Sequence, residues 1–195
     1  MPIAPKSIIG KAAVLALKKE TGKKSVELMK LDLSSLTSVR TFVKNFKENH
    51  PALHILINNA GVMMTPQSET EDGFETVPVI VQPTHTPTHT HTQQLGTNHL
   101  GHFLLTLLLV DLMKKSGPGG RIVNVSSKAS IRKVATIQFA DIHMKKNYGP
   151  YSAYAQSKLA NVLFTEALHR YPFSLFSFSL FRSSFFVLLT IYTQS

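Results

Sequence analysis

The chain has 195 residues, 43% of them hydrophobic, which is enough for one compact domain. It contains no cysteine, and this excludes disulfides, thiolate zinc sites and cysteine nucleophiles. The formal net charge of +10 suits a nucleic acid, an anionic membrane or a phosphate-bearing cofactor, so charge alone does not select the partner.

Helix-like and strand-like patterns alternate along residues 1–169, as they do in α/β domains. We predict helices at residues 11–19, from Leu36 to before Pro51, and at 95–115 and 151–169, and strands at 25–31, 53–57 and 121–125. Gly22 is a plausible end for the first helix, and Ser34 or Ser35 can cap the second. Strands joined by helical crossovers predict a doubly wound parallel sheet with ligands at the carboxyl ends of its strands.

A Pro/Thr/His-rich run at residues 77–92 interrupts this pattern, and its prolines favour a solvated loop over a helix or a central strand. Its His85, His89 and His91 could bind a transition metal. A flexible run offers nothing to orient the imidazoles, however, so we predict no metal site.

Residues 171–195 form a second irregular segment, with six of the twelve phenylalanines and a single charge, Arg182. This segment matches no amphipathic pattern. We therefore divide the chain into a domain at residues 1–170 and an unpaired apolar tail, and we expect removal of the tail to reduce aggregation or membrane partitioning.

Short polar segments follow each predicted strand: Asp32-Leu33-Ser34, Asn58-Asn59-Ala60-Gly61 and Ser126-Ser127. Each alone is also an ordinary helix start, turn or strand end. Their joint position at the carboxyl ends of three strands predicts a binding site there.

Tyr154 and Lys158 are four residues apart and share one face of a predicted helix. A phenol is a poor proton donor or base at neutral pH, so a catalytic tyrosine needs a nearby cation to stabilise its phenolate. Lys158 can supply that cation, whereas Tyr151 has no lysine at this offset. Ser127 could donate to a substrate carbonyl, and Asn98 could hold a water in a proton relay.

Five segments occur in order along the chain: NNAGVMM from Asn58, EDGFE from Glu71, TNHLGHFLLT from Thr97, RIVNVSS from Arg121 and YAQSKLANVLFT from Tyr154. Over residues 11–169, without the 77–92 run, they resemble short-chain dehydrogenases/reductases and are most similar to the retinol dehydrogenase group. The resemblance implies a Rossmann-like α/β domain, NADP or NAD with a slight preference for NADP, and reversible hydride transfer between an alcohol and a carbonyl. A small hydrophobic substrate such as a retinoid is implied as well.

The resemblance also implies a role for each matching residue. Tyr154 would be the general acid/base, and Lys158 would stabilise its phenolate and hold the nicotinamide ribose. Ser127 would polarise the substrate oxygen, and Asn98 would support the relay. The remaining cofactor contacts would come from Asp32 and Leu33 near the adenine, and from Asn59, Ala60 and Gly61.

Three departures from the family pattern predict an incomplete domain. The sequence has no TGxxxGxG turn, so the first βαβ unit is missing from a sheet whose family strand order is 3-2-1-4-5-6-7. The 77–92 run is an insertion, and the tail replaces the region that builds the substrate pocket. Translation of non-family sequence, from an alternatively or incompletely spliced transcript or a wrong gene model, would explain all three.

The alternative to an impaired oxidoreductase is an inactive fragment that binds proteins or membranes through exposed apolar surface. The 22 residues from 171 to 192 reach bilayer length, but Arg182 lies near their middle. No secretory signal is recognisable, which predicts an intracellular location, in the cytoplasm or on a membrane. The dispersed lysines accompany no nucleic-acid-binding motif, so we expect no nucleic-acid partner.

Overall fold

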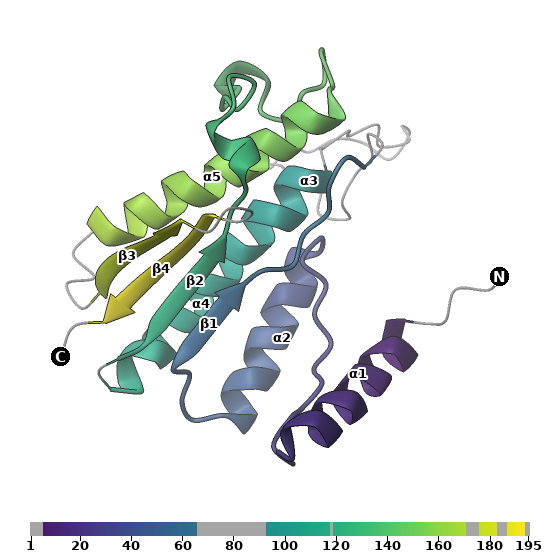
Figure 1. The fold of residues 1–195 in the computed structure, drawn as a ribbon, viewed down its shortest axis with the longest axis vertical. Helices are drawn as coiled ribbons and strands as arrows, with labels where there is room; N and C mark the ends of the chain where they lie inside the picture. The colour runs from purple at the N-terminus through teal and green to yellow at the C-terminus, as the bar shows by residue number, and fades with distance from the viewer. Residues whose placement is uncertain (1–5, 66–92, 118, 171–175, 183–186, 194–195) are drawn as a thin grey trace, which may run out of the picture. The chain divides into compact units, whose positions relative to one another are not determined.

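The computed structural model describes residues 6–65, 93–117, 119–170, 176–182 and 187–193, in two units that comprise residues 1–31 and 32–195 (Figure 1). The predicted run 77–92, with its three histidines, therefore lies outside the described residues. None of the helices in these described ranges has the length and apolar character needed to cross a membrane.

The first unit contains the helix α1 (Lys6–Thr21). Gly22 follows it with a φ of +68°, which glycine adopts without steric cost, and its N–H donates to Lys18 O at 3.0 Å. The predicted helix and its end are confirmed. The predicted strand at residues 25–31 is wrong, because these residues are irregular and pair with no strand in the described part of the chain.

Up to residue 170 the second unit contains the predicted helices and strands in the predicted order. Its helices are α2 (Leu36–Asn49), α3 (Gln93–Leu95), the π-helical η1 (Gly96–Leu100), α4 (Gly101–Lys115), the short η2 (Lys128–Ile131) and η3 (Phe139–Asp141), and α5 (Pro150–Arg170). Its strands are β1 (Ile55–Asn58), β2 (Arg121–Val125), β3 (Phe176–Arg182) and β4 (Val187–Thr193). Ser35 caps α2 by accepting a hydrogen bond from Ser38 N at 3.2 Å, which decides between the two predicted caps.

The strands lie in the order β1-β2-β4-β3. β1 and β2 are parallel, as predicted, whereas β4 is antiparallel to both β2 and β3. The expectation of an unpaired tail is therefore wrong, and the sheet is mixed. The physical reason is that only residues 183–186 separate β3 from β4, and so short a connection permits an antiparallel hairpin but no parallel crossover.

The helices α4 and α5 cover one face of β1 and β2. On that face Asn58 Nδ2 donates to Thr106 Oγ1 of α4 at 2.9 Å, and Asn124 Nδ2 donates to Thr165 Oγ1 of α5 at 3.0 Å. An apolar cluster continues the same layer and consists of Met113, Ile122, Phe164 and Leu168. The carboxyl ends of both strands are thus fixed against the helices that carry the predicted site residues.

β1 is the edge strand of this sheet, and no described strand pairs with its outer side. Ile55 and Ile57, which point away from the helix-covered face, are 52% and 61% exposed. β1 corresponds to the fourth strand of the family, whose neighbour in the family order is the first strand. The open edge thus agrees with the predicted absence of the first βαβ unit.

Candidate active site

A small cavity of about 140 Å³ lies at the carboxyl ends of β1 and β2. Four of the predicted site residues line it: Asn59 and Gly61 from the segment after β1, and Tyr154 and Lys158 from α5. The other lining residues, Val62, Met63, Val125 and Ser126, are neighbours of predicted residues in the sequence. The structure therefore brings the two strand ends and the Tyr/Lys pair together, as predicted from their positions.

Lys158 is buried beside Tyr154, with its side-chain nitrogen over the phenol ring. Nζ lies 5.8 Å from the centre of the Tyr154 ring and donates to Val125 O at 3.2 Å. Only 5% of the residue is exposed, and this burial lowers the pKa of its ammonium group. Because Lys158 is buried, little water screens the attraction between its positive charge and the Tyr154 side chain.

Asn98 connects the segment after β1 to the helix that carries the tyrosine. Its Oδ1 accepts from Val62 N at 2.8 Å, and its Nδ2 donates to Val62 O and to Ser157 Oγ at 2.9 and 3.0 Å. Ser157 Oγ in turn donates to Tyr154 O. Both amide hydrogens of Asn98 are thus used within the protein, so its side chain can offer a water only an oxygen lone pair.

The π-helical turn gives Asn98 a second function through its backbone. Its carbonyl accepts from His102 Nδ1 at 3.0 Å and from Asn161 Nδ2 at 3.1 Å. In a π-helix each backbone hydrogen bond joins residues five apart, whereas in an α-helix it joins residues four apart. Such turns are frequent at functional sites. The sequence predicted a continuous helix here and did not show this turn.

The two serines after β2 have different surroundings. Ser126 is 1% exposed, and its Oγ donates to Lys158 O at 2.7 Å. Ser127 is half-buried, and its Oγ accepts from Ala129 N at 3.2 Å. Within the described residues the Ser127 hydroxyl has no hydrogen-bond acceptor, but neither Ser127 nor Asn98 lines the cavity.

Asp32, Leu33 and Ala60 do not line the cavity. Asp32 is exposed, and its carboxylate accepts from the backbone and side chain of Ser34 in the turn before α2. Leu33 is buried against Gly101, where a Cβ at residue 101 would collide with the Leu33 carbonyl. Ala60 is exposed between two lining residues. The resemblance alone supports a cofactor role for these three residues.

Residues 8–171 match the short chain dehydrogenase family. The chain belongs to this family. Among curated relatives it is 46% identical to human polyprenol dehydrogenase over 163 residues and 46% identical to human retinol dehydrogenase 12 over 159 residues, with 82% of this chain and 44% of each relative covered. This short-chain dehydrogenase is thus close to the retinol dehydrogenase group, and it spans less than half the length of these relatives.

Solved structures show the same fold. An uncharacterised protein from Mycobacterium paratuberculosis superposes with a TM-score of 0.60 at 36% identity, over 83% of this chain and 48% of that protein. The Pseudomonas aeruginosa RhlG/NADP complex superposes with a TM-score of 0.54 at 20% identity, over 81% of this chain and 52% of that one. The α/β fold of this short-chain dehydrogenase is therefore that of a partial Rossmann-like domain.

The residues of this short-chain dehydrogenase fit one end of a nicotinamide dinucleotide. Tyr154 and Lys158 offer a hydroxyl and an ammonium group at the strand ends, and the exposed backbone of Asn59 and Gly61 lies beside them. A diphosphate, by contrast, requires convergent backbone N–H groups such as a glycine-rich turn at a helix N-terminus provides. The given sequence contains no TGxxxGxG turn.

Proposed function

We propose that this chain carries the proton-transfer groups of an NAD(P)-dependent alcohol–carbonyl oxidoreductase and binds the dinucleotide weakly. The observation that supports the proposal is the buried Lys158 ammonium 5.8 Å from the Tyr154 ring, at the strand ends. The names of the relatives suggest an apolar alcohol such as retinol or a polyprenol as the substrate.

In this mechanism Tyr154 exchanges a proton with the substrate oxygen. A phenol needs a neighbouring cation to do so at neutral pH, and Lys158 provides it. Ser127 donates a hydrogen bond to the same oxygen and keeps its proton, and Asn98 keeps the Val62 segment and the Tyr154 turn in position. The bound nicotinamide would supply or accept the hydride.

Tyr154→Phe tests this proposal, and Tyr151→Phe is its matched control on the same helix. Tyr151 is 42% exposed and does not line the cavity. With millimolar NADPH or NADH and an apolar aldehyde, we expect Tyr154→Phe to lower turnover by about 10² or more and Tyr151→Phe to change it less than about twofold. Equal activity of the two variants would reject the assignment of Tyr154.

The two serines provide a second comparison. Ser127→Ala should lower turnover about tenfold, and it should also cost about 1 kcal/mol of unfolding free energy because the cap bond from Ala129 N is lost. Ser126→Ala should cost a similar unfolding free energy, because it removes a buried hydrogen bond to Lys158 O, but it should lower turnover less. Steady-state rates and urea unfolding of both variants separate these effects.

Calorimetric titration with NADPH and NADH tests the weak binding. Without preorganised donors the diphosphate depends on exposed lysines, each of which contributes about 0–1 kcal/mol. Because each 1.4 kcal/mol changes affinity about tenfold, we expect dissociation constants near the millimolar range. Micromolar binding of either dinucleotide would contradict the proposed weak binding. An unimpaired oxidoreductase would then be the better proposal.

The second candidate function is that of an inactive fragment that binds another protein. The exposed edge of β1, with Ile55 and Ile57 turned to solvent, favours it. No turnover at saturating dinucleotide, together with a folded circular dichroism spectrum, would support this candidate over the first.

A further inference from the structure

Gln94 is a fully buried glutamine that does not line the cavity at Tyr154 but bonds to three separate parts of the chain. Its Oε1 accepts from Met64 N at 2.9 Å, and its Nε2 donates to Pro150 O at 2.9 Å and to the Tyr148 hydroxyl at 3.1 Å. A backbone N–H can only donate and a carbonyl can only accept, so the two backbone partners fix the orientation of the amide. Gln94 thus joins α3 to the segment after β1 and to the start of α5.

Tyr148 bonds both to Gln94 and to the same segment after β1. Its hydroxyl accepts from Gln94 Nε2 and donates to Thr65 O at 2.7 Å. Two side chains that bond to each other therefore hold the backbone at two successive residues, Met64 and Thr65. We call Gln94 and Tyr148 the glutamine–tyrosine clamp.

The backbone that the clamp holds has an unusual conformation. Met64 has a φ of +52°, in the left-handed region that residues with a Cβ rarely adopt. Such a conformation persists only where the surrounding structure maintains it. The Met64 side chain is largely exposed, so the hydrogen bond from its N–H to Gln94 maintains the conformation better than packing can. The preceding residue, Met63, lines the cavity, so a change at Met64 displaces the cavity wall.

The other end of the clamp lies at the first turn of the helix that carries Tyr154. Pro150 is the first residue of α5. In an α-helix each carbonyl accepts from the N–H four residues later, and for Pro150 that residue is Tyr154. Gln94 Nε2 is a second donor to the same carbonyl, from outside the helix. The clamp is therefore bonded directly to the turn that places the backbone of Tyr154.

We propose that Gln94 is a positioning residue, which sets the distance between the cavity wall at Met63 and the reactive hydroxyl of Tyr154. It acts through the two backbones that it joins and not by contact with a substrate, since it does not line the cavity. Asn98, four residues later, holds the same segment at Val62, so the two amides support successive parts of one wall. The inference rests on the proposed oxidoreductase.

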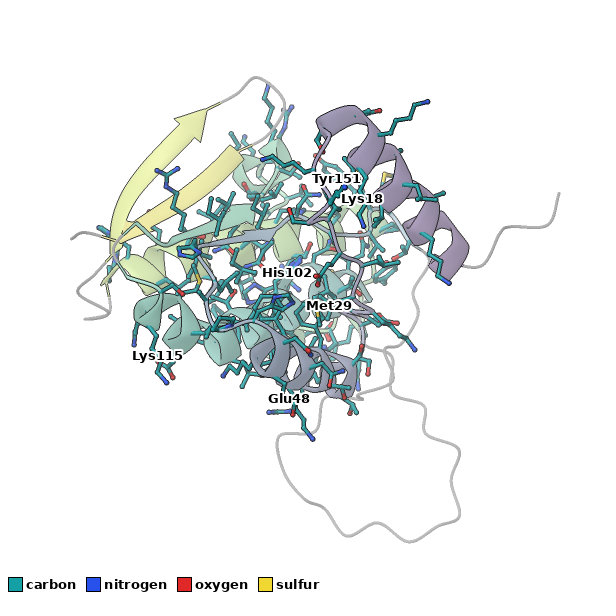
Figure 2. The ribbon with its side chains drawn as sticks, turned by 90° about the horizontal axis from the view of Figure 1, so that it is seen from below. Lys18, Met29, Glu48, His102, Lys115 and Tyr151 are labelled. Carbon is teal, nitrogen blue, oxygen red and sulfur yellow. The ribbon has the colours of Figure 1, made fainter. Side chains whose placement is uncertain are left out.

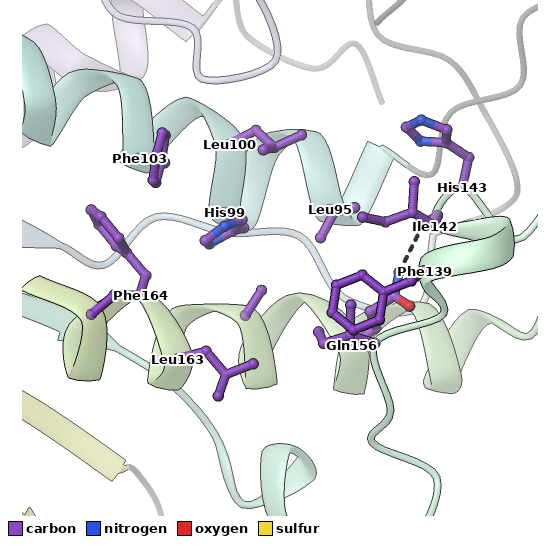
Figure 3. A pocket seen from close by; sticks show the side chains of 13 residues that line it. Leu95, His99, Leu100, Phe103, Phe139, Ile142, His143, Gln156, Leu163 and Phe164 are labelled. Carbon is purple, nitrogen blue, oxygen red and sulfur yellow. Dashed lines mark hydrogen bonds between the residues drawn. The ribbon is translucent and has the colours of Figure 1, made fainter. Parts of the chain in front are cut away.

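Gln94→Met removes the hydrogen-bonding amide and keeps a side chain of similar length. Gln156→Met is the comparison, because Gln156 is also fully buried and its amide is also bonded twice, from Gln138 N at 2.9 Å and to Ile142 O at 2.8 Å. Figure 3 shows the bond between Gln156 and Ile142 as a dashed line. Neither Gln138 nor Ile142 lines the cavity at Tyr154. Both variants should therefore unfold at similarly lowered urea concentrations, and only Gln94→Met should change the site.

Turnover of decanal at millimolar NADPH or NADH measures that change. We expect Gln94→Met to lower kcat about tenfold, because a displaced tyrosine transfers its proton more slowly. Its KM for the dinucleotide should change less than about threefold, since Gly61 lies beside Val62, which Asn98 still holds. Gln156→Met should change both constants less than about threefold. An equal loss of kcat in the two variants, or a raised KM with kcat unchanged, would overturn the proposal.

Amide hydrogen exchange tests the clamp without turnover. The Met64 N–H should exchange at least about tenfold faster in Gln94→Met than in the native chain, because it loses its acceptor, and at the native rate in Gln156→Met. Unchanged exchange in Gln94→Met would overturn the proposal. A native chain that shows this exchange pattern but no turnover would reject the proposed oxidoreductase and still support the clamp, so the two failures are distinguishable.

Tyr148→Phe separates the two members of the clamp, and Tyr151→Phe on the exposed side is its control. Tyr148→Phe removes one hydroxyl, while Gln94 keeps its bonds to Met64 N and Pro150 O. We therefore expect kcat to fall about threefold in Tyr148→Phe and less than about twofold in Tyr151→Phe. A loss of kcat in Tyr148→Phe as large as that in Gln94→Met would overturn the assignment of Gln94 as the residue that sets the distance.

Discussion

The backbone of Gly61 passes so close to Asn98 that a Cβ at position 61 would lie 2.8 Å from Asn98 Oδ1 and 3.7 Å from Lys158 Nζ. The segment after β1 is therefore closely packed against both residues. Asn98 holds the next residue, Val62, through its N–H and its carbonyl. The glycine here provides space and not an unusual backbone conformation, since its φ is not positive.

Gly61→Ala should destabilise the protein by about 1–3 kcal/mol, because the added methyl group must displace the Asn98 amide. Activity should fall with it, since the Val62 segment lines the cavity beside Tyr154. Urea unfolding and turnover measure the two effects. Ala60→Ser, at the exposed preceding position, is the control and should change stability by no more than about 0.5 kcal/mol.

Lys158→Met should abolish turnover and raise the unfolding free energy by about 1 kcal/mol. The gain is expected because a buried ammonium group is replaced by an apolar side chain of similar length. The substitution removes the hydrogen bond from Lys158 to Val125 O, but this carbonyl still accepts one from Asn161 Nδ2 at 3.3 Å.

The difference in unfolding free energy between Lys158→Met and the native protein should depend on pH. Burial lowers the pKa of Lys158 from its ordinary value of 10.5, so the unfolded chain binds more protons between this lowered pKa and pH 10.5. The native protein therefore gains stability as the pH rises toward 10.5, and the difference between native and variant should shrink. A variant less stable than the native protein at pH 7 would contradict this prediction.

Acidification should destabilise the fold through His102, which lies inside the helical layer while Glu48 and Lys115 lie exposed at its rim (Figure 2). Burial, partly offset by the hydrogen bond to Asn98 O, lowers the pKa of His102 from 6.5 to about 4. Between these values the unfolded chain binds the extra proton, so stability is complete above pH 6.5 and falls toward pH 4. The loss is of the order of 3 kcal/mol.

Urea unfolding at pH 7, 5.5 and 4.5 measures this loss. His102→Gln should flatten the pH dependence, because its side chain does not titrate, whereas His54→Gln at an exposed position should retain it. Equal slopes for the native protein and His102→Gln would show that other groups cause the acid sensitivity. His99, whose pKa burial also lowers, acts in the same direction.

Truncation after Arg170 should reduce the yield of soluble protein. β4 pairs with all five residues of β2, from Arg121 to Val125, so its removal leaves a sheet of two short strands. This reverses the expectation from the sequence, in which the tail was unpaired. A truncated chain that is as soluble and as stable to urea as the full chain would show that β4 contributes nothing to the fold.

The sequence predicted those elements whose signals are local. Ser35, Gly22 and the apolar spacing of α2 determine helix ends and faces within a few residues, and the polar segments after β1 and β2 follow from the α/β pattern. The strand at residues 25–31 was wrong because a strand forms only with a partner, and none is present among the described strands.

Long-range features of the site were not predictable in the same way. The π-helical turn at Asn98 depends on Val62, Ser157 and Asn161, which are 36 to 63 residues away. Nothing in the sequence showed the hydrogen bond from Ser126 to the carbonyl of Lys158. The pairing of β4 with β2 also joins residues that are far apart in the sequence, so no local pattern predicts it.

The uncharged edge of β1 has a consequence for how the protein behaves at different concentrations. Its four residues, ILIN, carry no lysine or proline that would discourage pairing with another chain. Two molecules that meet at this edge can extend each other's sheets, and the rate of such encounters rises with the square of concentration. Slow synthesis with abundant chaperones should therefore give more usable protein than strong expression.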